Sequence, residues 1–240
     1  MSTARTILVT GANQGLGMHA VHQLAKTPDV LTFMGSRKIA AAEEARAKFA
    51  SDIHSSSSVV PVQLDITDAT SIANAHAFIS DYLKEKNLPG LDVLVNNAAI
   101  VGKSFEDTFA TNVAGTAAVT EAFLPLLNKP GGAIINVSSR LGSNTLFAQK
   151  ASNPAYPAYS SSKAALNSLT TQWAMLESQK GSGIRVISVC HILLGFNATN
   201  LNRYTGTGNP ADGAQVIVKE ALAKEGKTAV FVHKDGEYPW

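Results

Sequence analysis

The chain has 240 residues, of which 45% are hydrophobic and 16% charged, a composition typical of one folded α/β domain with a large core. Its net charge is only +2 and it has no long block of Lys or Arg, so neither a nucleic acid nor a membrane is expected among its partners. The N-terminus lacks the layout of a signal peptide, no apolar run is long enough to span a membrane, and the single Cys190 cannot form an internal disulfide, which together favour a cytoplasmic protein.

The first predicted elements are a buried strand at 6–10, a glycine-rich turn and a helix at 18–26. Glycines in the turn let the backbone approach a ligand, and the helix N-terminus behind it offers unpaired N–H groups to a pyrophosphate. The glycine spacing differs from the usual dinucleotide fingerprint, so the prediction depends on the position of the turn between the first strand and the first helix. The residues predicted to contact a dinucleotide here are Gly11, Asn13, Gln14, Gly15, Leu16 and Gly17.

The second predicted strand, at 30–34, leads to a basic segment that bears on the choice of dinucleotide. Arg37 lies about 20 positions past the glycine turn, where such folds place the residue that faces the adenosine ribose. A carboxylate there would bond the ribose 2′-hydroxyl, but no Asp or Glu occurs between positions 30 and 42. Ser36, Arg37 and the neighbouring Lys38 therefore favour NADP over NAD, and a solvated basic cluster at a strand end is the alternative.

The third and fourth predicted strands, at 59–64 and 91–95, both end in residues suited to a ligand crevice. Ligands bind in such sheets outside the carboxyl ends of the strands, so Asp65 and Ile66 are expected to face the crevice. Small residues after the fourth strand permit close approach of the backbone to a ligand, although a plain turn explains them equally well in isolation. These residues are Asn97, Ala98 and Ala99.

The remaining patterns complete an alternating series of strands and helices. Further helices are predicted at 40–50, 69–86, 105–127, 159–179 and 211–224, and further strands at 132–137, 183–189 and 228–232. Two irregular connections are expected at 142–158 and 194–210. Seven strands alternating with six helices specify a doubly wound, Rossmann-like parallel sheet with helices on both faces, in a single domain that spans residues 1–240.

The helix predicted at 159–179 begins with Tyr159-Ser-Ser-Ser-Lys163, which places a phenol and an amine one turn apart on the same face. Free tyrosine titrates near ~10, and a nearby ammonium favours the phenolate and lowers that pKa. Such a pair can give a proton to, or take one from, an alcohol or carbonyl oxygen. Alone, the spacing is better explained by a solvated lysine beside a half-buried tyrosine, so a functional interpretation depends on the other motifs.

Five motifs, taken together and in this order, resemble those of the short-chain dehydrogenase/reductase family over essentially the whole chain. They are Thr10-Gly11-x-x-x-Gly15-x-Gly17, Asn96-Asn97-Ala98, Asn112, Ser139 and Tyr159-x-x-x-Lys163. The segments 111–115 and 234–240 further resemble the carbonyl-reductase-like branch of that family.

The resemblance implies a catalytic set of Asn112, Ser139, Tyr159 and Lys163. Ser139 would polarise the substrate carbonyl, and Tyr159 would donate a proton as hydride arrives from the nicotinamide. Lys163 would lower the pKa of Tyr159 and bond the nicotinamide ribose. Asn112 would hold a water that relays protons to Lys163, and Leu194 would contact the cofactor.

Two departures from the family pattern stand close to these residues. His191-Ile192 occupies the place of the usual Pro-Gly, so His191 is a candidate for substrate contact, and the segment 142–158 is enlarged and is expected to shape the substrate pocket. His19 and His22 lie one turn apart but lack a third ligand, so helix packing is the preferred interpretation and no metal site is expected.

The leading hypothesis is an NADPH-dependent reductase that converts a ketone or aldehyde to an alcohol, with NADP(H) as the cofactor. Apolar residues expected near the pocket favour an apolar substrate; they are Phe147, Leu193, Leu194 and Phe196. An NAD-linked alcohol dehydrogenase and a non-catalytic dinucleotide sensor or scaffold are the alternatives. The substrate and the formation of a homo-oligomer are left open.

Overall fold

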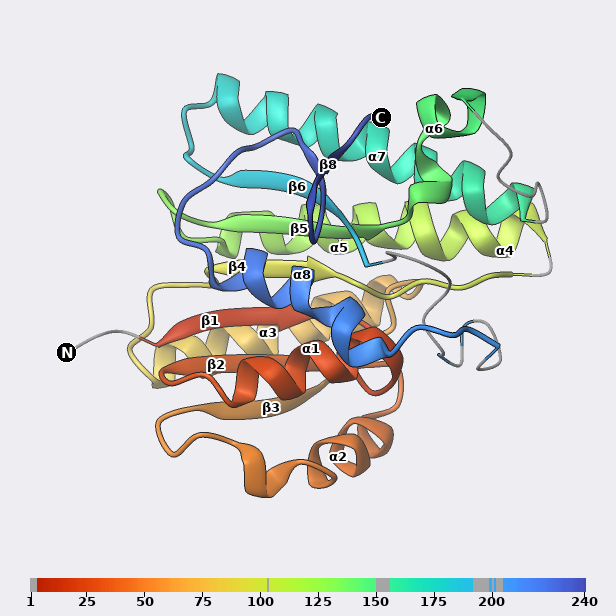
Figure 1. Ribbon diagram of the computed structural model, residues 1–240. Helices are drawn as coiled ribbons and strands as arrows, with labels where there is room; N and C mark the ends of the chain where they lie inside the picture. Colours follow the sequence, from red (N-terminus) through yellow and green to blue (C-terminus); the bar gives the residue numbers. More distant parts are fainter. Residues whose placement is uncertain (1–3, 103, 150–155, 192–198, 200, 202–204) are drawn as a thin grey trace.

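A computed structural model of the chain describes residues 4–102, 104–149, 156–191, 199, 201 and 205–240 (Figure 1). Its centre is one sheet with the strand order β3-β2-β1-β4-β5-β6-β7-β8. The strands are β1 (Arg5–Val9), β2 (Val30–Ser36), β3 (Ser58–Gln63), β4 (Val93–Asn96), β5 (Ala133–Ser138), β6 (Arg185–Cys190), β7 (Phe231–His233) and β8 (Gly236–Tyr238). Strands β1 to β7 pair in parallel, and β8 pairs antiparallel with β7.

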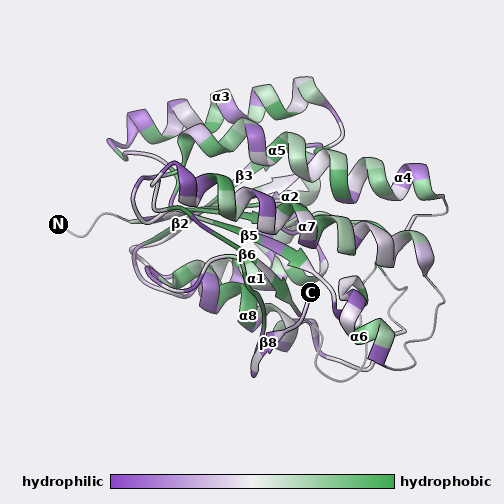
Figure 2. Cartoon of the chain, turned by 90° about the horizontal axis from the view of Figure 1, so that it is seen from above, coloured by the Kyte–Doolittle hydropathy of each residue, from purple (hydrophilic) through white to green (hydrophobic). Residues whose placement is uncertain are grey.

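Helices cover both faces of the sheet (Figures 1 and 2). The α-helices are α1 (Gly15–Ala25), α2 (Ile39–Ala47), α3 (Ala69–Glu85), α4 (Phe105–Phe109), α5 (Thr116–Phe123), α6 (Asn144–Gln149), α7 (Pro157–Gln179) and α8 (Pro210–Leu222). Side chains of α1, α2 and α8 belong to one hydrophobic cluster, and those of α3, α5 and α7 belong to the other. Among the described residues, no helix is both long and apolar enough to cross a membrane.

The two hydrophobic clusters follow from the alternation of side chains along each strand. In β1, Ile7 and Val9 belong to the cluster with α1, whereas Leu8 belongs to the cluster on the opposite face. All three are fully buried, as expected for a parallel sheet that is covered on both sides. The predicted doubly wound fold is therefore confirmed. The strand order reverses between β1 and β4, and ligands bind at such a point, outside the carboxyl ends of the strands.

Several boundaries differ from the sequence-based expectation. The single helix predicted at 105–127 is interrupted by a π-helix, η2 (Ala110–Gly115), and ends in a 3₁₀ turn, η3 (Leu124–Leu126). The predicted irregular connection at 142–158 contains α6 and follows a 3₁₀ turn, η4 (Arg140–Gly142). The strand β8 was not predicted, because three residues are too few to show a periodicity.

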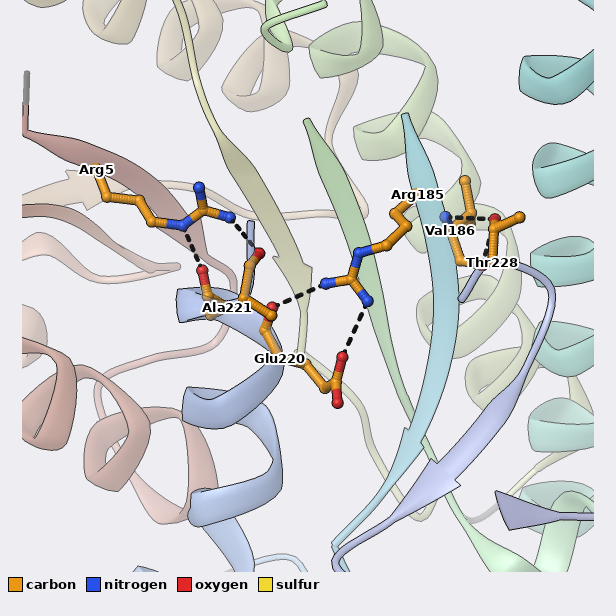
Figure 3. A network of polar contacts seen from close by, with 7 residues as sticks. Arg5, Arg185, Val186, Glu220, Ala221 and Thr228 are labelled. Carbon is orange, nitrogen blue, oxygen red and sulfur yellow. Dashed lines mark hydrogen bonds and ion pairs between the residues drawn. The ribbon is translucent and has the colours of Figure 1, made fainter. Parts of the chain in front are cut away.

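Helix α8 is held at its C-terminal end by two arginines from the sheet (Figure 3). Arg5 donates from Nε to the carbonyl oxygen of Ala221 at 2.6 Å and from Nη2 to that of Ala223 at 2.8 Å. Arg185 donates to the Glu220 carboxylate at 3.0 Å and to its carbonyl oxygen at 3.1 Å. The last carbonyls of a helix lack partners within it, so these contacts satisfy groups that burial would otherwise penalise.

Candidate active site

A cavity of about 390 Å³ lies at the carboxyl ends of the central strands, on the side predicted from the strand order. Most of the residues predicted to bind a dinucleotide line it. These are Gly11, Asn13, Gln14, Gly15, Leu16, Ser36, Arg37, Asp65, Ile66, Asn97, Ala98, Ala99, Tyr159 and Lys163. Gly17 does not line the cavity, and Leu194 lies outside the described residues.

The glycine turn is built against the segment that follows β4. Gly11 has φ +60°, and a Cβ atom there would lie 2.8 Å from the Cα of Ala98, so both conformation and space require glycine. Asn97 donates from Nδ2 to the carbonyl oxygens of Thr10 at 2.8 Å and Gly11 at 3.1 Å. A Cβ atom at Gly17 would lie 2.5 Å from the same Nδ2. Gly17 therefore makes room for Asn97, and its contact with a dinucleotide stays a prediction.

The donors along one part of the cavity fit a pyrophosphate. Helix α1 begins at Gly15, its N-cap residue Gln14 makes no side-chain capping bond, and its first turn holds no acidic residue. The first N–H groups of the helix therefore lie beside the cavity without a capping bond from Gln14, at the end where the helix dipole is positive. Leu16, the second residue of the helix, also lines the cavity.

The basic residues after β2 give the cavity a positively charged end. Arg37 and Lys38 both line it, and the Arg37 side chain is exposed, as expected for a group that contacts a ligand at the rim. Ser36 donates from Oγ to the carbonyl oxygen of Lys38 at 2.9 Å and so fixes the turn that carries both side chains. This end of the cavity fits a ribose that carries a phosphate group better than a ribose with only uncharged hydroxyl groups.

Further residues line the cavity that the sequence interpretation did not name as cofactor contacts. They are Lys38, Ala41, Leu64, Thr67, Ile100, Thr111, Val137, His191, Thr199 and Leu201. Most of them are neighbours of predicted residues and could have been found by extending each predicted segment. Thr199 and Leu201 come from the connection at 194–210, where no periodic pattern gave a signal.

Helix α7 brings Tyr159 and Lys163 to the inner end of the cavity. Pro157 is the first residue of the helix, a position that proline favours, so the phenol follows within its first turn. Both side chains are buried, with exposed fractions of 7% for Tyr159 and 3% for Lys163. The Lys163 Nζ lies 5.7 Å from the centre of the Tyr159 ring and donates to the carbonyl oxygen of Val137 at 2.7 Å.

The pKa of Tyr159 moves in the direction opposite to the sequence-based expectation. Burial raises it, and the nearby Cys190 adds to this, whereas a hydrogen bond with the Ser139 side chain acts the other way. Burial likewise lowers the pKa of Lys163 to about 8. The expected depression by Lys163 is not seen, because desolvation of the phenolate is the largest effect on the pKa of Tyr159. The Lys163 amino group donates to the Val137 carbonyl.

Ser139 follows directly after β5 and is fully buried. Its Oγ accepts a hydrogen bond from the N–H of Leu141 at 3.2 Å, which makes it the N-cap of η4. Its side chain lies near the Tyr159 hydroxyl, whose pKa it lowers, and Lys163 donates to the carbonyl oxygen of Val137, two positions before it. The predicted partners Ser139, Tyr159 and Lys163 thus lie together in the structure.

Asn112 occupies the π-helix η2, an irregularity of a kind that is frequent at functional sites. Its Oδ1 accepts from the N–H of Ile100 at 2.8 Å, and its Nδ2 donates to the carbonyl oxygen of Ile100 at 2.9 Å and to the Oγ of Ser162 at 3.0 Å. Ser162 in turn donates to the carbonyl oxygen of Tyr159 at 2.7 Å. Asn112 therefore connects the cavity wall at Ile100 to the first turn of α7.

The histidines divide between the cavity and the surface. His191 lines the cavity, and burial together with the charge of Lys163 lowers its pKa to about 3, which keeps the imidazole neutral. His22 stacks on Phe49 and pairs with Asp52 at 2.7 Å, in agreement with a packing role. Over the described ranges, no cluster of three or more His, Cys, Asp or Glu side chains could hold a metal ion.

A row of buried polar side chains fixes α7 on the sheet. Asn96 donates from Nδ2 to Thr120 at 2.9 Å and to the Oδ1 of Asn136 at 2.8 Å. Asn136 donates to the Oγ1 of Thr170 at 2.8 Å, and Thr170 bonds Ser188 at 2.9 Å. Fully paired networks of this kind specify one packing arrangement. This network therefore fixes the position of α7, and with it the positions of Tyr159 and Lys163.

Comparisons with known proteins agree with this arrangement. The short chain dehydrogenase family model matches residues 5–209. The short-chain dehydrogenase anuI of Penicillium roqueforti (strain FM164) is 32% identical over 236 residues, which cover 91% of this chain and 89% of that protein. Two solved structures are similar over nearly their whole length. The carbonyl reductase Sniffer of D. melanogaster has a TM-score of 0.81 at 27% identity, covering 99% of this chain and 100% of that one. The NADPH-bound carbonyl reductase from chicken fatty liver has a TM-score of 0.77 at 28% identity, covering 100% of both chains.

The family model accounts for most of the chain, including every motif from the glycine turn to Tyr159 and Lys163. The chain therefore belongs to the short-chain dehydrogenase family.

Proposed function

We propose that this protein is an NADPH-dependent reductase of ketones or aldehydes. The observation that carries the proposal is that Tyr159 and Lys163, with Ser139 beside Tyr159, lie at a cavity whose other walls suit a phosphorylated dinucleotide. The similarity to an NADPH-bound carbonyl reductase structure supports the same reaction class.

Each of the three residues has a distinct part in the proposed reaction. NADPH, when bound, supplies the hydride that reduces the carbonyl carbon. Ser139 bonds the carbonyl oxygen, and Tyr159 transfers its phenolic proton to that oxygen, so that an alcohol and NADP⁺ result. The raised pKa of Tyr159 keeps the phenol protonated at neutral pH, which is the form a proton donor requires.

Lys163 balances the charge that this proton transfer leaves behind. With a pKa of about 8, its amino group is mostly protonated at neutral pH and offsets the negative charge of the new phenolate. Its position next to the Tyr159 ring allows this effect without a change of fold. Asn112 is proposed to hold the first turn of α7 in place through Ser162, and the proton relay through a water at Asn112 remains a prediction.

NADP(H) is proposed as the cofactor because two basic side chains and no carboxylate follow β2. Arg37 and Lys38 attract a 2′-phosphate, whereas NAD offers them only hydroxyl groups. Titration of the purified protein with NADPH and NADH tests this directly. We expect NADPH to bind at least about tenfold more tightly, and tighter binding of NADH would support the NAD-linked alcohol dehydrogenase instead.

The reaction itself is tested by incubating the protein with NADPH and a panel of apolar and polar carbonyl compounds while the nicotinamide absorbance is followed. We expect consumption of NADPH with at least one compound and a rate reduced by about 10²-fold or more in Ser139→Ala. Tight NADPH binding without turnover of any carbonyl would point to the non-catalytic sensor. Tyr82→Phe, which like Ser139→Ala removes a single hydroxyl group but on the distant helix α3, is the control for altered folding.

A further inference from the structure

A short segment at the far edge of the sheet is joined to the candidate catalytic residues. We propose that residues 236–240, here called the clasp, position the segment 139–149, and that this contact determines how a carbonyl substrate is held but not how the cofactor is bound. The clasp consists of β8 with Pro239 and Trp240. The inference rests on the proposed function, because it assigns the clasp a part in the same reaction.

The clasp is anchored by aromatic stacking on β7. Phe231 is almost completely buried, and its ring stacks on that of Trp240 with centroids 5.6 Å apart and an angle of 15° between the planes. The Tyr238 ring meets Phe231 edge to face at 5.6 Å and stacks on His233 at 4.1 Å. Contacts of this kind fix the position of aromatic rings beyond the effect of burial alone. Trp240 therefore has a defined place, although no regular element contains it.

Two hydrogen bonds join the clasp to the start of α6. The buried Ser143 donates from Oγ to the carbonyl oxygen of Pro239 at 2.7 Å, and the N–H of Thr145 donates to the main-chain oxygen of Trp240 at 3.1 Å. The same Ser143 oxygen accepts from the N–H of Leu146 at 3.1 Å. The first turn of α6 is thus held from outside by a segment almost 100 positions later in the chain.

The same segment, 139–149, also packs on α7. A Cβ atom at Gly142 would lie 2.6 Å from the main-chain carbon of Lys163, so this turn packs directly on the helix at the catalytic position. Asn167 donates from Nδ2 to the carbonyl oxygen of Gly142 at 3.1 Å. The N–H of Gly142 donates to the carbonyl oxygen of Ser139 at 2.7 Å. The segment 139–149 is therefore held by α7 at Gly142 and by the clasp at Ser143 and Thr145.

The position of the Ser139 side chain depends on these contacts, because Ser139 is the first residue of the segment 139–149. Its Oγ accepts from the N–H of Leu141 within η4, so the direction of the hydroxyl depends on where η4 lies. A shift of even an ångström in a group that positions a substrate lowers rates substantially. Among the described residues that line the cavity, none comes from 140–149 or from the clasp, so cofactor contacts are not affected by the same shift.

The experiment compares Trp240→Ala with Trp240→Phe, which retains an aromatic ring to stack on Phe231. Ser143→Ala removes the side-chain bond to Pro239 together with the bond from the N–H of Leu146, and Glu237→Gln is the matched control, since Glu237 lies in β8 but pairs with Lys227 at the surface. Three quantities are measured for each variant: hydrogen exchange of the amides in 141–149, the Kd of NADPH, and kcat and KM for a reduced carbonyl.

In Trp240→Ala we expect exchange in 141–149 to accelerate about tenfold or more and kcat/KM for the carbonyl to fall roughly tenfold, while the Kd of NADPH changes less than about twofold. Ser143→Ala should also accelerate exchange in 141–149 and lower kcat/KM for the carbonyl. Trp240→Phe and Glu237→Gln should resemble the parent protein in all three quantities.

Unchanged exchange in 141–149 in a folded Trp240→Ala variant would overturn the inference. Equal losses in NADPH and carbonyl binding would overturn it as well, because they indicate general destabilisation. If the parent protein reduces no carbonyl, the proposed function fails, and the exchange measurement still decides whether the clasp holds the segment.

Discussion

The buried amine of Lys163 is expected to lower the free energy of unfolding of the protein. Its pKa is about 8 in the folded chain, against an ordinary value of 10.5, because burial penalises the charged form. That difference corresponds to about 3 kcal/mol. Lys163→Met keeps the length of the side chain and removes the charge, but it also removes the bond to the Val137 carbonyl, which contributes about 1 kcal/mol. The variant should therefore be more stable than the parent by about 2 kcal/mol at neutral pH, and inactive.

The higher free energy of unfolding expected for Lys163→Met should depend on pH, and this dependence is a sharper test than the size of the difference. Between pH 8 and 10.5 the unfolded parent binds more protons than the folded parent, so its free energy of unfolding rises with pH, and the variant lacks this rise. Urea unfolding at several pH values, without added cofactor, should show the advantage of Lys163→Met shrinking by about 2 kcal/mol from pH 8 to about pH 9.5. Lys84→Met, at an exposed position of α3, should show no such trend. A variant less stable than the parent at neutral pH, or a difference independent of pH, would refute the reasoning.

Three further substitutions test other parts of the site. Arg37→Asp should weaken NADPH binding by at least about tenfold and leave NADH binding nearly unchanged in a fluorescence titration, since it removes the charge proposed to meet the 2′-phosphate. Gly17→Ala should lower stability by about 1–3 kcal/mol in urea unfolding and weaken the binding of either dinucleotide, because its Cβ would collide with the Asn97 amide that holds the glycine turn. Asn136→Ala should lower the free energy of unfolding by about 1–3 kcal/mol, because it removes two buried hydrogen bonds of the polar row, one from the Asn96 amide and one to the Thr170 hydroxyl; a loss below about 1 kcal/mol would contradict that role.

The parts of the structure that could be predicted from the sequence are those set by local patterns. Buried runs of β-branched residues predicted the parallel strands, and the glycine turn between β1 and α1 predicted the side of the sheet where the cavity lies. Tyr159 and Lys163 share one helix face because their spacing matches the helical repeat. Residues that follow strand ends, such as Asn97, could be assigned to the crevice because parallel strands all end at one edge.

Features that depend on contacts between distant segments could not be predicted in this way. The clasp has no periodic pattern and is held by Phe231 and Ser143, which lie elsewhere in the chain. The π-helix around Asn112 interrupts an apparently continuous helical pattern. The direction of the Tyr159 pKa was also missed, because the spacing to Lys163 shows a neighbouring charge but not the depth of burial.

The central claim is that Tyr159 gives the proton while hydride comes from bound NADPH. The most direct test is the rate of a single turnover with Tyr159→Phe, a substitution that removes only the hydroxyl group, measured together with the Kd of NADPH. We expect the Kd to stay within about twofold of the parent and the rate of carbonyl reduction to fall by about 10²–10⁴-fold. A variant that binds NADPH normally and reduces the carbonyl at the parental rate would contradict the claim.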